Sequence, residues 1–176
     1  VNTGPADTMP NCSALFATIV NTAQRRLWMS SPYFVPDDVL VRALQAAAIR
    51  GVDVRILLPG KADHRLVELA SFTYYGEMLD CGVRLFRYQD RFLHQKVFLV
   101  DDQLAGVGTV NLDNRAIYLN FEATALVADE GLAKRVETML KADLAQCETV
   151  IPEQFDNKPL RFRVAARIAR LASPLL

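Results

Sequence analysis

Apolar residues recur with two different spacings along this chain, and each spacing predicts a different kind of element. Within residues 13–25 they return every three or four positions, as they do on one face of a helix. Residues 52–60 alternate and then become continuously apolar, which is typical of a buried strand. Up to residue 88 the two kinds of element alternate, with helices predicted over 13–25, 37–51 and 64–81 and strands over 27–34, 52–60 and 83–88.

The pattern changes after residue 90. Three strand-like segments, 92–100, 104–110 and 121–128, follow one another with no helical pattern between them. A helix is predicted after them, over about 130–147. Parallel strands need a long crossover, usually a helix, whereas strands joined by short connections pair antiparallel. The chain therefore predicts an α/β fold with a mixed sheet.

The two ends of the chain differ from this middle part. Residues 1–12 are rich in Pro, Gly, Asn and Asp and are predicted to be a linker or arm, which leaves 13–157 as the globular unit. Residues 158–176 contain a basic amphipathic helix, which either lies in a membrane interface or packs on its own domain. Its apolar stripe is Leu160, Val164, Ile168 and Leu171, and its basic stripe is Arg163, Arg167 and Arg170.

Composition adds a charge asymmetry. The 176 residues fit one domain, and 20 basic residues balance 20 acidic ones, so the total charge does not indicate a nucleic acid partner. Asp156 is the last acidic residue, and five basic residues follow it, which gives the C-terminal segment an excess of positive charge. Such asymmetry predicts contact with an anionic surface.

Cysteine spacing and hydropathy exclude several classes of protein. Cys12, Cys81 and Cys147 form no C-x-x-C pair, which argues against a disulfide framework or a zinc site and favours a reducing compartment. No apolar run approaches the length that spans a bilayer, and we find no secretory signal. Because the chain begins at Val1 rather than Met, we expect it to be part of a longer protein.

Candidate chemistry lies in the segment FLHQKVFLVDD, residues 92–102. Side chains alternate across a strand, so His94 and Lys96 share one face and stand roughly 6.6 Å apart along it. At that separation an imidazole and an ammonium can hold two atoms of the same phosphate. An arbitrary H-x-K is more often a cationic pair at a solvated strand end, so the neighbouring residues decide between the two interpretations.

Those neighbouring residues are suited to a phosphate. Gly108 permits close approach of the backbone, and the Thr109 hydroxyl and Asn111 amide are neutral donors for phosphate oxygens. Glu122 opens the next predicted strand, and a carboxylate near a histidine commonly fixes its tautomer. Arg115 either contacts a phosphate or forms a salt bridge with Asp113 or another acid. His64 is the only other histidine and lacks a lysine two residues on.

These residues resemble the signature of the phospholipase D superfamily, H-x-K-x4-D followed by G-[ST]-x-N. The signature runs here from His94 through Lys96 to Asp101 and then from Gly108 to Asn111, with Thr109 where Ser is commoner. The flanking segments 30–38, 60–70, 107–116, 120–129 and 173–176 resemble the C-terminal half of bacterial cardiolipin synthases, and this resemblance runs from about residue 13 to the end.

The resemblance implies a phospholipase D-like α-β-α sandwich with a mixed β-sheet, in which 13–157 is a catalytic half-domain. It also implies a two-step reaction: one motif's histidine forms a phosphohistidine and the other motif's histidine protonates the leaving alcohol. His94, Lys96, Asn111, Glu122 and Asp101 are then the motif's catalytic set, with Lys96, Asn111 and Thr109 stabilising phosphoryl charge and Glu122 orienting His94. We expect Asp101 to serve structure rather than chemistry. No metal or cofactor is required.

The function implied is a phosphatidyltransferase that makes cardiolipin from phosphatidylglycerol. Its partners are then an anionic phospholipid, the cytoplasmic side of the bacterial inner membrane, and either an N-terminal half with its own motif or a second copy of this chain. A phospholipase D-type hydrolase and a one-motif homodimeric nuclease remain alternatives, although the nuclease would carry excess positive charge over its main domain. The resemblance favours His94 as general acid, while the lipids and the nucleophile stay open.

Overall fold

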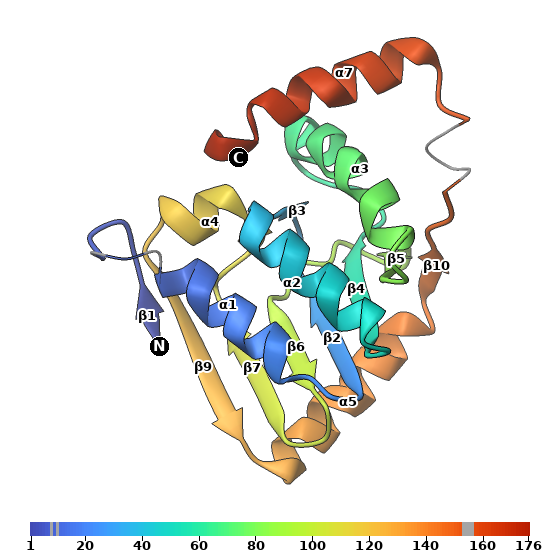
Figure 1. The fold of residues 1–176 in the computed structure, drawn as a ribbon. Coiled ribbons are helices and arrows are strands. Elements are labelled where there is room, and N and C mark those ends of the chain that lie inside the picture. The colour runs from blue at the N-terminus through green and yellow to red at the C-terminus, as the bar shows by residue number, and fades with distance from the viewer. Residues whose placement is uncertain (8, 10, 153–156) are drawn as a thin grey trace.

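One mixed eight-stranded sheet organises the computed structural model, in the order β1-β9-β7-β6-β2-β4-β5-β10 (Figure 1). The structure describes residues 1–7, 9, 11–152 and 157–176. β2, β4 and β5 run parallel and all other neighbouring strands of this sheet run antiparallel, as the change of spacing near residue 90 predicted. The strands are β1 (Asn2–Thr3), β2 (Arg26–Ser30), β4 (Asp53–Pro59), β5 (Arg84–Tyr88), β6 (Val97–Val100), β7 (Leu104–Gly108), β9 (Glu122–Ala128) and β10 (Cys147–Thr149).

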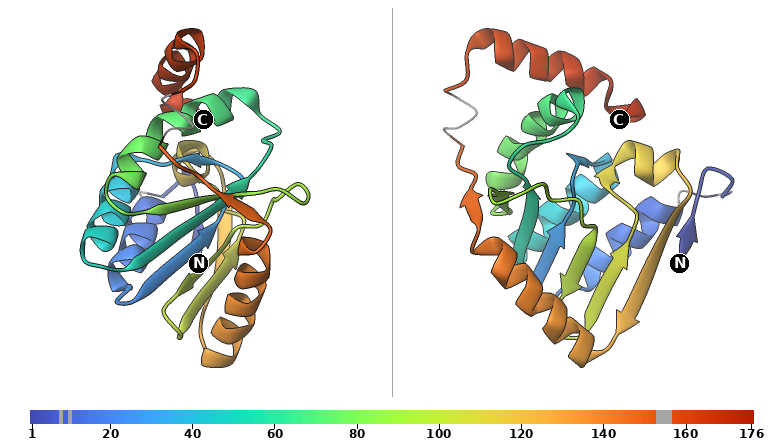
Figure 2. Two further views of the ribbon diagram at one scale, coloured as in Figure 1. Left: turned by 90° about the vertical axis from the view of Figure 1, so that its right-hand side faces the viewer. Right: turned by 180° about the vertical axis from the view of Figure 1, so that it is seen from behind.

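Helices cover both faces of the sheet (Figure 2). Neighbouring side chains of β6 show the division, because Phe98 packs in the cluster with α1, α2 and α3 while Leu99 packs in the cluster with α5. The molecule is therefore an α-β-α sandwich. The helices are α1 (Asn11–Thr22), α2 (Asp38–Ile49), α3 (Arg65–Leu79), α4 (Asn114–Tyr118), α5 (Glu130–Leu144), α7 (Leu160–Leu171) and the 3-10 helix η1 (Ser173–Leu175).

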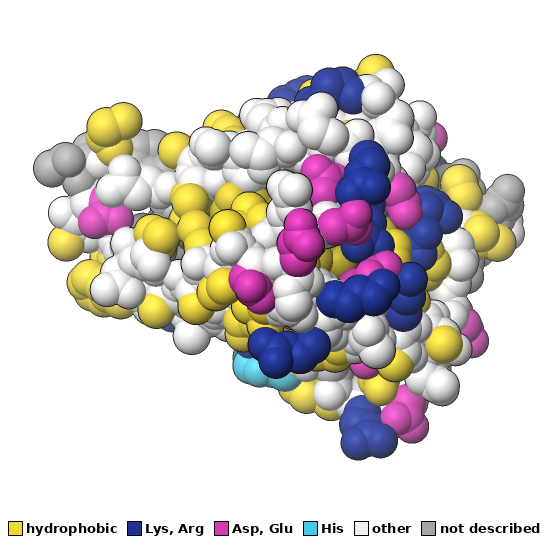
Figure 3. Space-filling view, turned by 90° about the horizontal axis from the view of Figure 1, so that it is seen from below, with side chains coloured by type: hydrophobic (Ala, Val, Ile, Leu, Met, Phe, Trp, Pro, Cys, Tyr) yellow, Lys and Arg dark blue, Asp and Glu magenta, His cyan; other side chains and the backbone are white. Residues whose placement is uncertain are grey.

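Charged side chains of both signs are interspersed at the end of the sheet where β2 and β4 begin (Figure 3). Arg26 of β2 donates to Glu137 of α5, 2.6 Å away. Hydrogen bonds from Arg26, Lys141 and Lys134 hold the pKa of Glu137 well below its usual range. Asp53 accepts from Arg55 and Arg84. This end of the molecule therefore presents paired charges rather than a patch of one sign.

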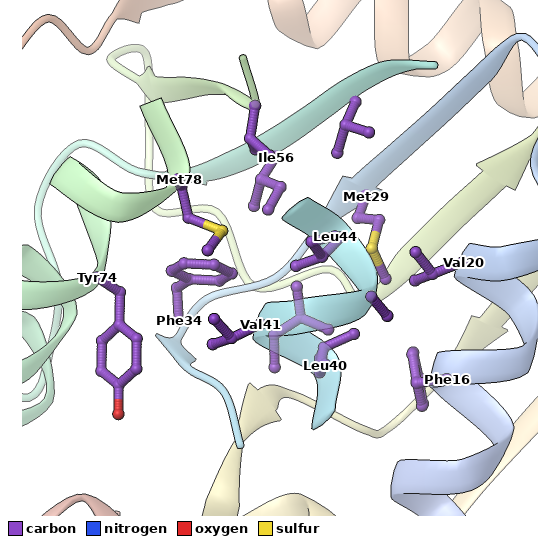
Figure 4. Close-up of a cluster of buried hydrophobic side chains, with 14 of the residues drawn as sticks. Phe16, Val20, Met29, Phe34, Leu40, Val41, Leu44, Ile56, Tyr74 and Met78 are labelled. Carbon is purple, nitrogen blue, oxygen red and sulfur yellow. The ribbon is translucent and has the colours of Figure 1, made fainter. Parts of the chain in front are cut away.

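The larger core lies between the sheet and α1, α2 and α3 (Figure 4). Phe34 is fully buried there and meets the Tyr74 ring edge-on, with centroids 6.3 Å apart. α2 begins at Asp37, whose carboxylate accepts from the Leu40 amide, 2.8 Å away. The same carboxylate accepts from Tyr118 of α4, 2.6 Å away, so one buried acid joins two helices next to the core.

The predicted strand 27–34 is in fact two strands. β2 ends at Ser30, and Phe34–Val35 forms β3, which pairs in parallel with β8 (Leu112–Asp113) as a separate two-stranded sheet. Pro32 lies at the break, because proline has no N–H to give to a ladder. The pairing of β3 with β8 brings residues 108–113 to the end of β2.

Two further predicted boundaries were wrong. The strand predicted over 92–100 forms a β-strand only over Val97–Val100, and the helix predicted over 130–147 ends at Leu144. Cys147–Thr149 forms β10, which pairs with β5 at the sheet edge. Three residues are too few for a periodic pattern, so no local pattern indicates this strand.

The predicted N-terminal arm adds a short edge strand. β1 pairs antiparallel with β9, and the amino group of Val1 donates to the Thr124 carbonyl, 2.7 Å away. Residues 8 and 10 of the predicted arm and residues 153–156 of the predicted globular unit, with the charge of Asp156, lie outside the described residues.

The basic amphipathic helix α7 packs on α3, but not by its apolar stripe. Ala166 and Ala169 are buried, and Phe162 meets the Phe72 ring with centroids 5.2 Å apart. Arg170 donates to Glu77 of α3, 3.1 Å away. The predicted stripe points away from the domain instead, with exposed fractions of 75% for Leu160, 48% for Val164, 62% for Ile168 and 82% for Leu171.

Candidate active site

His94 and Lys96 lie in the extended segment that leads into β6, at the edge of the sheet where β4 and β5 end. The strand-like alternation continues through this segment. Leu93 is buried in the cluster with α5, and Gln95 donates to Asp143 of α5, 2.7 Å away. Because these two side chains face α5, His94 and Lys96 face the other way, as the sequence predicted.

The two side chains contact each other. The Nζ of Lys96 lies 3.0 Å from the Nδ1 of His94 and donates to the His94 carbonyl, 2.9 Å away. The His94 ring is exposed and stacks on Phe92, with centroids 5.5 Å apart. Partial burial lowers the pKa of Lys96, while the charges of Glu122, Asp113 and Asp63 oppose that shift. The ammonium therefore lies within electrostatic reach of three carboxylates from three segments.

Thr109 and Glu122 form a separate hydrogen-bonded unit beside this pair. The Thr109 hydroxyl donates to the Glu122 carboxylate and accepts from the Ala123 amide, 3.0 Å away. Asn120 donates to the other carboxylate oxygen, 3.0 Å away. We expected Glu122 to orient His94, but the structure shows no hydrogen bond between those two described side chains. Glu122 holds Thr109 instead.

Asn111 is partly buried and lies just before β8. Its Oδ1 is buried without a hydrogen-bond partner, and its side chain contacts Asp113. Burial raises the pKa of Asp113, against the opposing hydrogen bonds from the Ala116 amide and Asn111. Ser31 fixes this segment, since its hydroxyl accepts from the Leu112 amide, 3.0 Å away. The Asn111 amide nitrogen, rather than this buried oxygen, carries the N–H donors that suit a phosphate oxygen.

Gly108 has a structural reason to be glycine. Its amide donates to the Lys96 carbonyl, 3.0 Å away, which joins the two parts of the signature. A Cβ at Gly108 would lie 2.5 Å from the Ala123 carbonyl and 2.6 Å from the Thr124 hydroxyl. The close approach of β9 therefore requires glycine at position 108, independently of any contact with a phosphate.

Arg115 and Asp101 are not brought to the pair. The Arg115 amide donates to the Leu176 carbonyl, 2.7 Å away, and its exposed side chain pairs with none of the described carboxylates. Asp101 follows the far end of β6, about 23 Å of extended chain from His94. Asp101 thus belongs to the signature in the sequence and lies away from the chemistry in the structure.

Sequence reasoning missed a group contributed by the loop after β4. The Tyr33 hydroxyl donates to both oxygens of Asp63, at 2.9 and 3.0 Å, and the His64 ring meets the Tyr33 ring edge-on at 5.8 Å. Burial and the Asp63 contact raise the pKa of Tyr33. The available signal was position: Asp63 follows a buried parallel strand, and ligands gather where such strands end.

A cavity of about 440 Å³ opens beside the pair. Its walls come from the loop after β4, the end of β5 and the segment before His94. Among all the residues that the structure describes, including those of the cavity, no group of three His, Cys, Asp or Glu side chains has the arrangement of a metal site. No helix of the described part is long and apolar enough to cross a membrane.

The site thus offers an exposed imidazole, an adjacent ammonium, a hydroxyl held by a carboxylate and the N–H donors of the Asn111 amide. An imidazole can attack a phosphorus atom or move a proton, and the remaining groups suit the oxygens of a phosphoryl group. These groups form one side of a phosphate site, with a single histidine in it.

Comparison with known protein families gives a match to the model described as "Cardiolipin synthase, PLD-like domain", over residues 16–144. A cardiolipin synthase A of Pseudomonas putida (strain W619) is 49% identical over 173 residues, which is 98% of this chain and 36% of that protein. The cardiolipin synthase A of Pseudomonas aeruginosa (strain LESB58) is 48% identical over 176 residues, 100% of this chain and 36% of that protein. The chain therefore spans about a third of the length of these relatives.

Solved structures show the same fold at low sequence identity. The phospholipase D family member Nuc from Salmonella typhimurium superposes with a TM-score of 0.68 at 23% identity, covering 78% of this chain and 89% of that one. The phosphatidylserine synthase of Haemophilus influenzae Rd KW20 gives a TM-score of 0.76 at 15% identity, covering 100% of this chain and 47% of that one.

Proposed function

Since this chain belongs to the family of phospholipase D-like domains of cardiolipin synthases, we propose that it supplies one of two half-sites of a phosphatidyltransferase. The enzyme joins two phosphatidylglycerol molecules into cardiolipin and releases glycerol. One observation carries this proposal: the exposed imidazole of His94 lies 3.0 Å from the Lys96 ammonium at the edge where the parallel strands end. Ligands of α/β sheets bind at such edges.

The proposed reaction has two steps at phosphorus. First, one histidine nitrogen bonds to phosphorus, the bond from phosphorus to the glycerol oxygen breaks, and the other half-site's histidine gives that oxygen a proton. Then the hydroxyl of a second phosphatidylglycerol forms a new bond to phosphorus, the phosphorus–nitrogen bond breaks, and the hydroxyl proton returns to the second histidine. We assign His94 to proton transfer, following the resemblance of its motif.

The other groups of this half-site act on phosphoryl charge. The Lys96 ammonium and the N–H groups of the Asn111 amide stabilise the oxygens as negative charge develops on them. The Thr109 hydroxyl joins them when it turns its one proton from Glu122 to a phosphoryl oxygen. Glu122 is a positioning residue in this scheme, because its carboxylate holds Thr109. Gly108 keeps β9 close to the site, and Arg115 remains a candidate for the lipid phosphate at its periphery.

The complete enzyme tests this proposal directly. His94→Ala should abolish cardiolipin formation from phosphatidylglycerol, and Lys96→Ala should lower it by roughly 100-fold or more, the scale of losing one charge-stabilising group. Thermal melts should not change, because the His94 side chain is exposed and Lys96 is only partly buried. His64→Ala is the matched control and should keep most of the activity. A well-folded His94→Ala enzyme that still makes cardiolipin would remove the proposal.

A hydrolase of the same superfamily differs only in using water as acceptor. Its product would be phosphatidic acid, so an assay that separates the two lipids distinguishes the reactions. A nuclease would need an excess of positive charge around the site. The basic excess of this chain lies in residues 158–176 rather than in the domain that carries the site.

A membrane surface is the second partner we propose, on the cytoplasmic side of the bacterial inner membrane. α7 turns Leu160, Ile168 and Leu171 outward while its other face packs on α3. Arg161 and Arg167 are exposed on either side of this apolar stripe. A helix with an apolar stripe between arginines binds anionic lipid by burial and charge together. Such a contact would hold the site near lipid headgroups.

A further inference from the structure

The cavity beside His94 takes no part in the reaction proposed at the first phosphate. Its volume is about 440 Å³, and it is open to solvent where the loop after β4 faces the segment that leads to His94. Lining residues are Gly60, Lys61, Ala62, Asp63, Tyr88, Gln89, Arg91 and Phe92.

One wall of the cavity contacts the reacting pair, and a second lies within electrostatic reach of it. On one side, the Phe92 ring stacks on the His94 ring, with centroids 5.5 Å apart and planes inclined by 29°. On the other side, Asp63 is one of the three carboxylates whose charge acts on Lys96. The cavity therefore continues directly from the place where the phosphoryl group would be held.

The loop that forms the second wall is anchored at both ends. The Gly60 amide donates to the Tyr88 carbonyl, 2.8 Å away, and Arg87 donates to the Gly60 carbonyl, 2.5 Å away. Three residues on, Tyr33 holds both carboxylate oxygens of Asp63. A Cβ on Gly60 would lie 2.5 Å from the Tyr88 carbonyl, so this approach requires glycine. Lys61, between the two anchors, stays exposed.

The cavity carries two cations over an apolar wall. No described carboxylate pairs with the Lys61 ammonium. Arg91 bonds to its neighbour Asp90 through Nε at 2.9 Å, which uses one of the five N–H donors of the guanidinium. Ala62, Tyr88 and Phe92 supply apolar surface between them. Cations beside apolar surface suit a phosphate joined to a short carbon chain.

We propose that this cavity binds the headgroup of the acceptor lipid, with Lys61 and Arg91 holding its phosphate. This inference rests on the proposed phosphatidyl transfer. The acceptor's free hydroxyl is three carbons away from its own phosphate, so anchoring that phosphate in the cavity directs the hydroxyl toward the phosphorus beside His94. The hydroxyl oxygen then forms the new bond to phosphorus, the bond to the histidine nitrogen breaks, and the proton passes to the other histidine.

The distinguishing consequence concerns the choice of acceptor. Water and small neutral alcohols carry no phosphate, so neither needs the two cations. A phosphatidylglycerol acceptor does need them, and losing a charged hydrogen bond to a phosphate reduces binding by about tenfold or more. Removing the cations should therefore divert the phosphorylated enzyme from lipid acceptors to water, and it should leave the first step intact.

The experiment uses the complete two-half enzyme with phosphatidylglycerol vesicles. Glycerol release reports the first step, and cardiolipin and phosphatidic acid report the two fates of the intermediate. Lys61→Ala and Arg91→Ala should each lower the ratio of cardiolipin to phosphatidic acid by about tenfold, with glycerol release retained. With ethanol added, both variants should form phosphatidylethanol as the parent enzyme does. Arg135→Ala removes an exposed arginine on α5 and serves as the control.

The outcomes distinguish a failure of the acceptor site from a failure of the proposed phosphatidyl transfer. An unchanged product ratio in the Lys61→Ala and Arg91→Ala double variant overturns the acceptor site. An equal fall in glycerol, cardiolipin and phosphatidylethanol also overturns it, because the cations would then act on the first phosphate or on the fold. If the parent enzyme makes neither cardiolipin nor phosphatidylethanol, the proposed phosphatidyl transfer itself fails.

Discussion

Asp101 joins two chain segments that are distant in sequence. Its carboxylate accepts from the backbone amides of Arg25 and Arg26, 2.8 and 2.9 Å away, and from that of Gln24 at 3.1 Å. Its φ of 50° lies in the left-handed region, which Asp adopts more readily than most residues. Partial burial raises the pKa of Asp101, but the amide donors outweigh burial, so the pKa is lowered overall.

This geometry predicts a stability effect with a defined pH dependence. Asp101→Ala should lower the free energy of unfolding by about 2 kcal/mol at neutral pH, the scale of losing hydrogen bonds to a charged group. Because the folded-state pKa is lowered, the stabilisation is complete above the ordinary pKa of about 3.9 and is lost as the pH falls below it. Chemical denaturation of both proteins at pH 7 and pH 3 should show the difference shrinking.

Asp101→Asn is the matched control for this prediction. Asn tolerates the left-handed backbone and keeps one acceptor oxygen, so it should lose less stability than Ala. At a temperature where all three proteins are folded, the complete enzyme should turn over equally with each residue. An Asp101→Ala enzyme with an unchanged melt and lost turnover would return Asp101 to the catalytic set.

Single residues show which parts of the site could be predicted from the sequence. His94 and Lys96 were predicted as a pair because both come from one strand-like segment, where spacing fixes direction. Asp63 and Ser31 were missed because they reach the site through the pairing of β2 with β4 and of β3 with β8, which no local pattern encodes. The role of Glu122 was misjudged for a related reason: its partner Thr109 lies across the β7–β9 ladder.

At the scale of elements, periodicity predicted helices and long strands and failed on short pieces. β3, β8 and β10 have two or three residues each, and their pairing depends on distant partners. α7 shows where periodicity leaves a choice open, since its apolar stripe predicts either packing on the domain or contact with a membrane. Its pattern was read correctly, and an apolar stripe normally faces the core. Here two buried alanines of the other face, Ala166 and Ala169, make the contact with α3.

The outward stripe of α7 predicts binding of this chain to anionic vesicles. Replacing Leu160, Ile168 and Leu171 together by Ser should weaken partitioning by about tenfold or more, because each loses roughly 1 kcal/mol of apolar burial. Arg161→Ala with Arg167→Ala should weaken it further at low salt and little at high salt. Vesicle sedimentation at two ionic strengths measures both effects.

A control for these variants comes from apolar residues exposed on other helices. Ile49 of α2 and Val39 near its start have exposed fractions of 73% and 50%. Neither residue lies between two arginines, so Ser at these positions should not change partitioning. Deleting residues 158–176 is a poorer test, because it would also uncover the face of α3 on which α7 packs. Equal partitioning of the stripe variant and the parent would assign the helix to the fold alone.

At the scale of the whole molecule, the family and the α-β-α fold were predictable because the sequence contains the phospholipase D signature together with its flanking segments. The match over residues 16–144 and the solved phospholipase D-family structures confirm both. The proposal of a second half-site rests on counting histidines. The fold places His64 just before α3, where its ring packs on Tyr33, and it has no lysine two residues on.

The proposed chemistry needs one histidine to attack phosphorus and another to move a proton, and this chain offers only His94 in the required setting. We therefore expect the isolated 176-residue chain to be inactive on phosphatidylglycerol and a second motif-bearing half to restore cardiolipin formation. A half whose own motif histidine is replaced by Ala should fail to restore it, which separates catalysis from stabilisation. If activity instead rises with the square of chain concentration, and mixing with the His94→Ala chain lowers it, two copies pair about a twofold axis. Robust turnover by a sample shown to be monomeric by analytical ultracentrifugation would contradict the half-site, because a single chain would then supply both histidines.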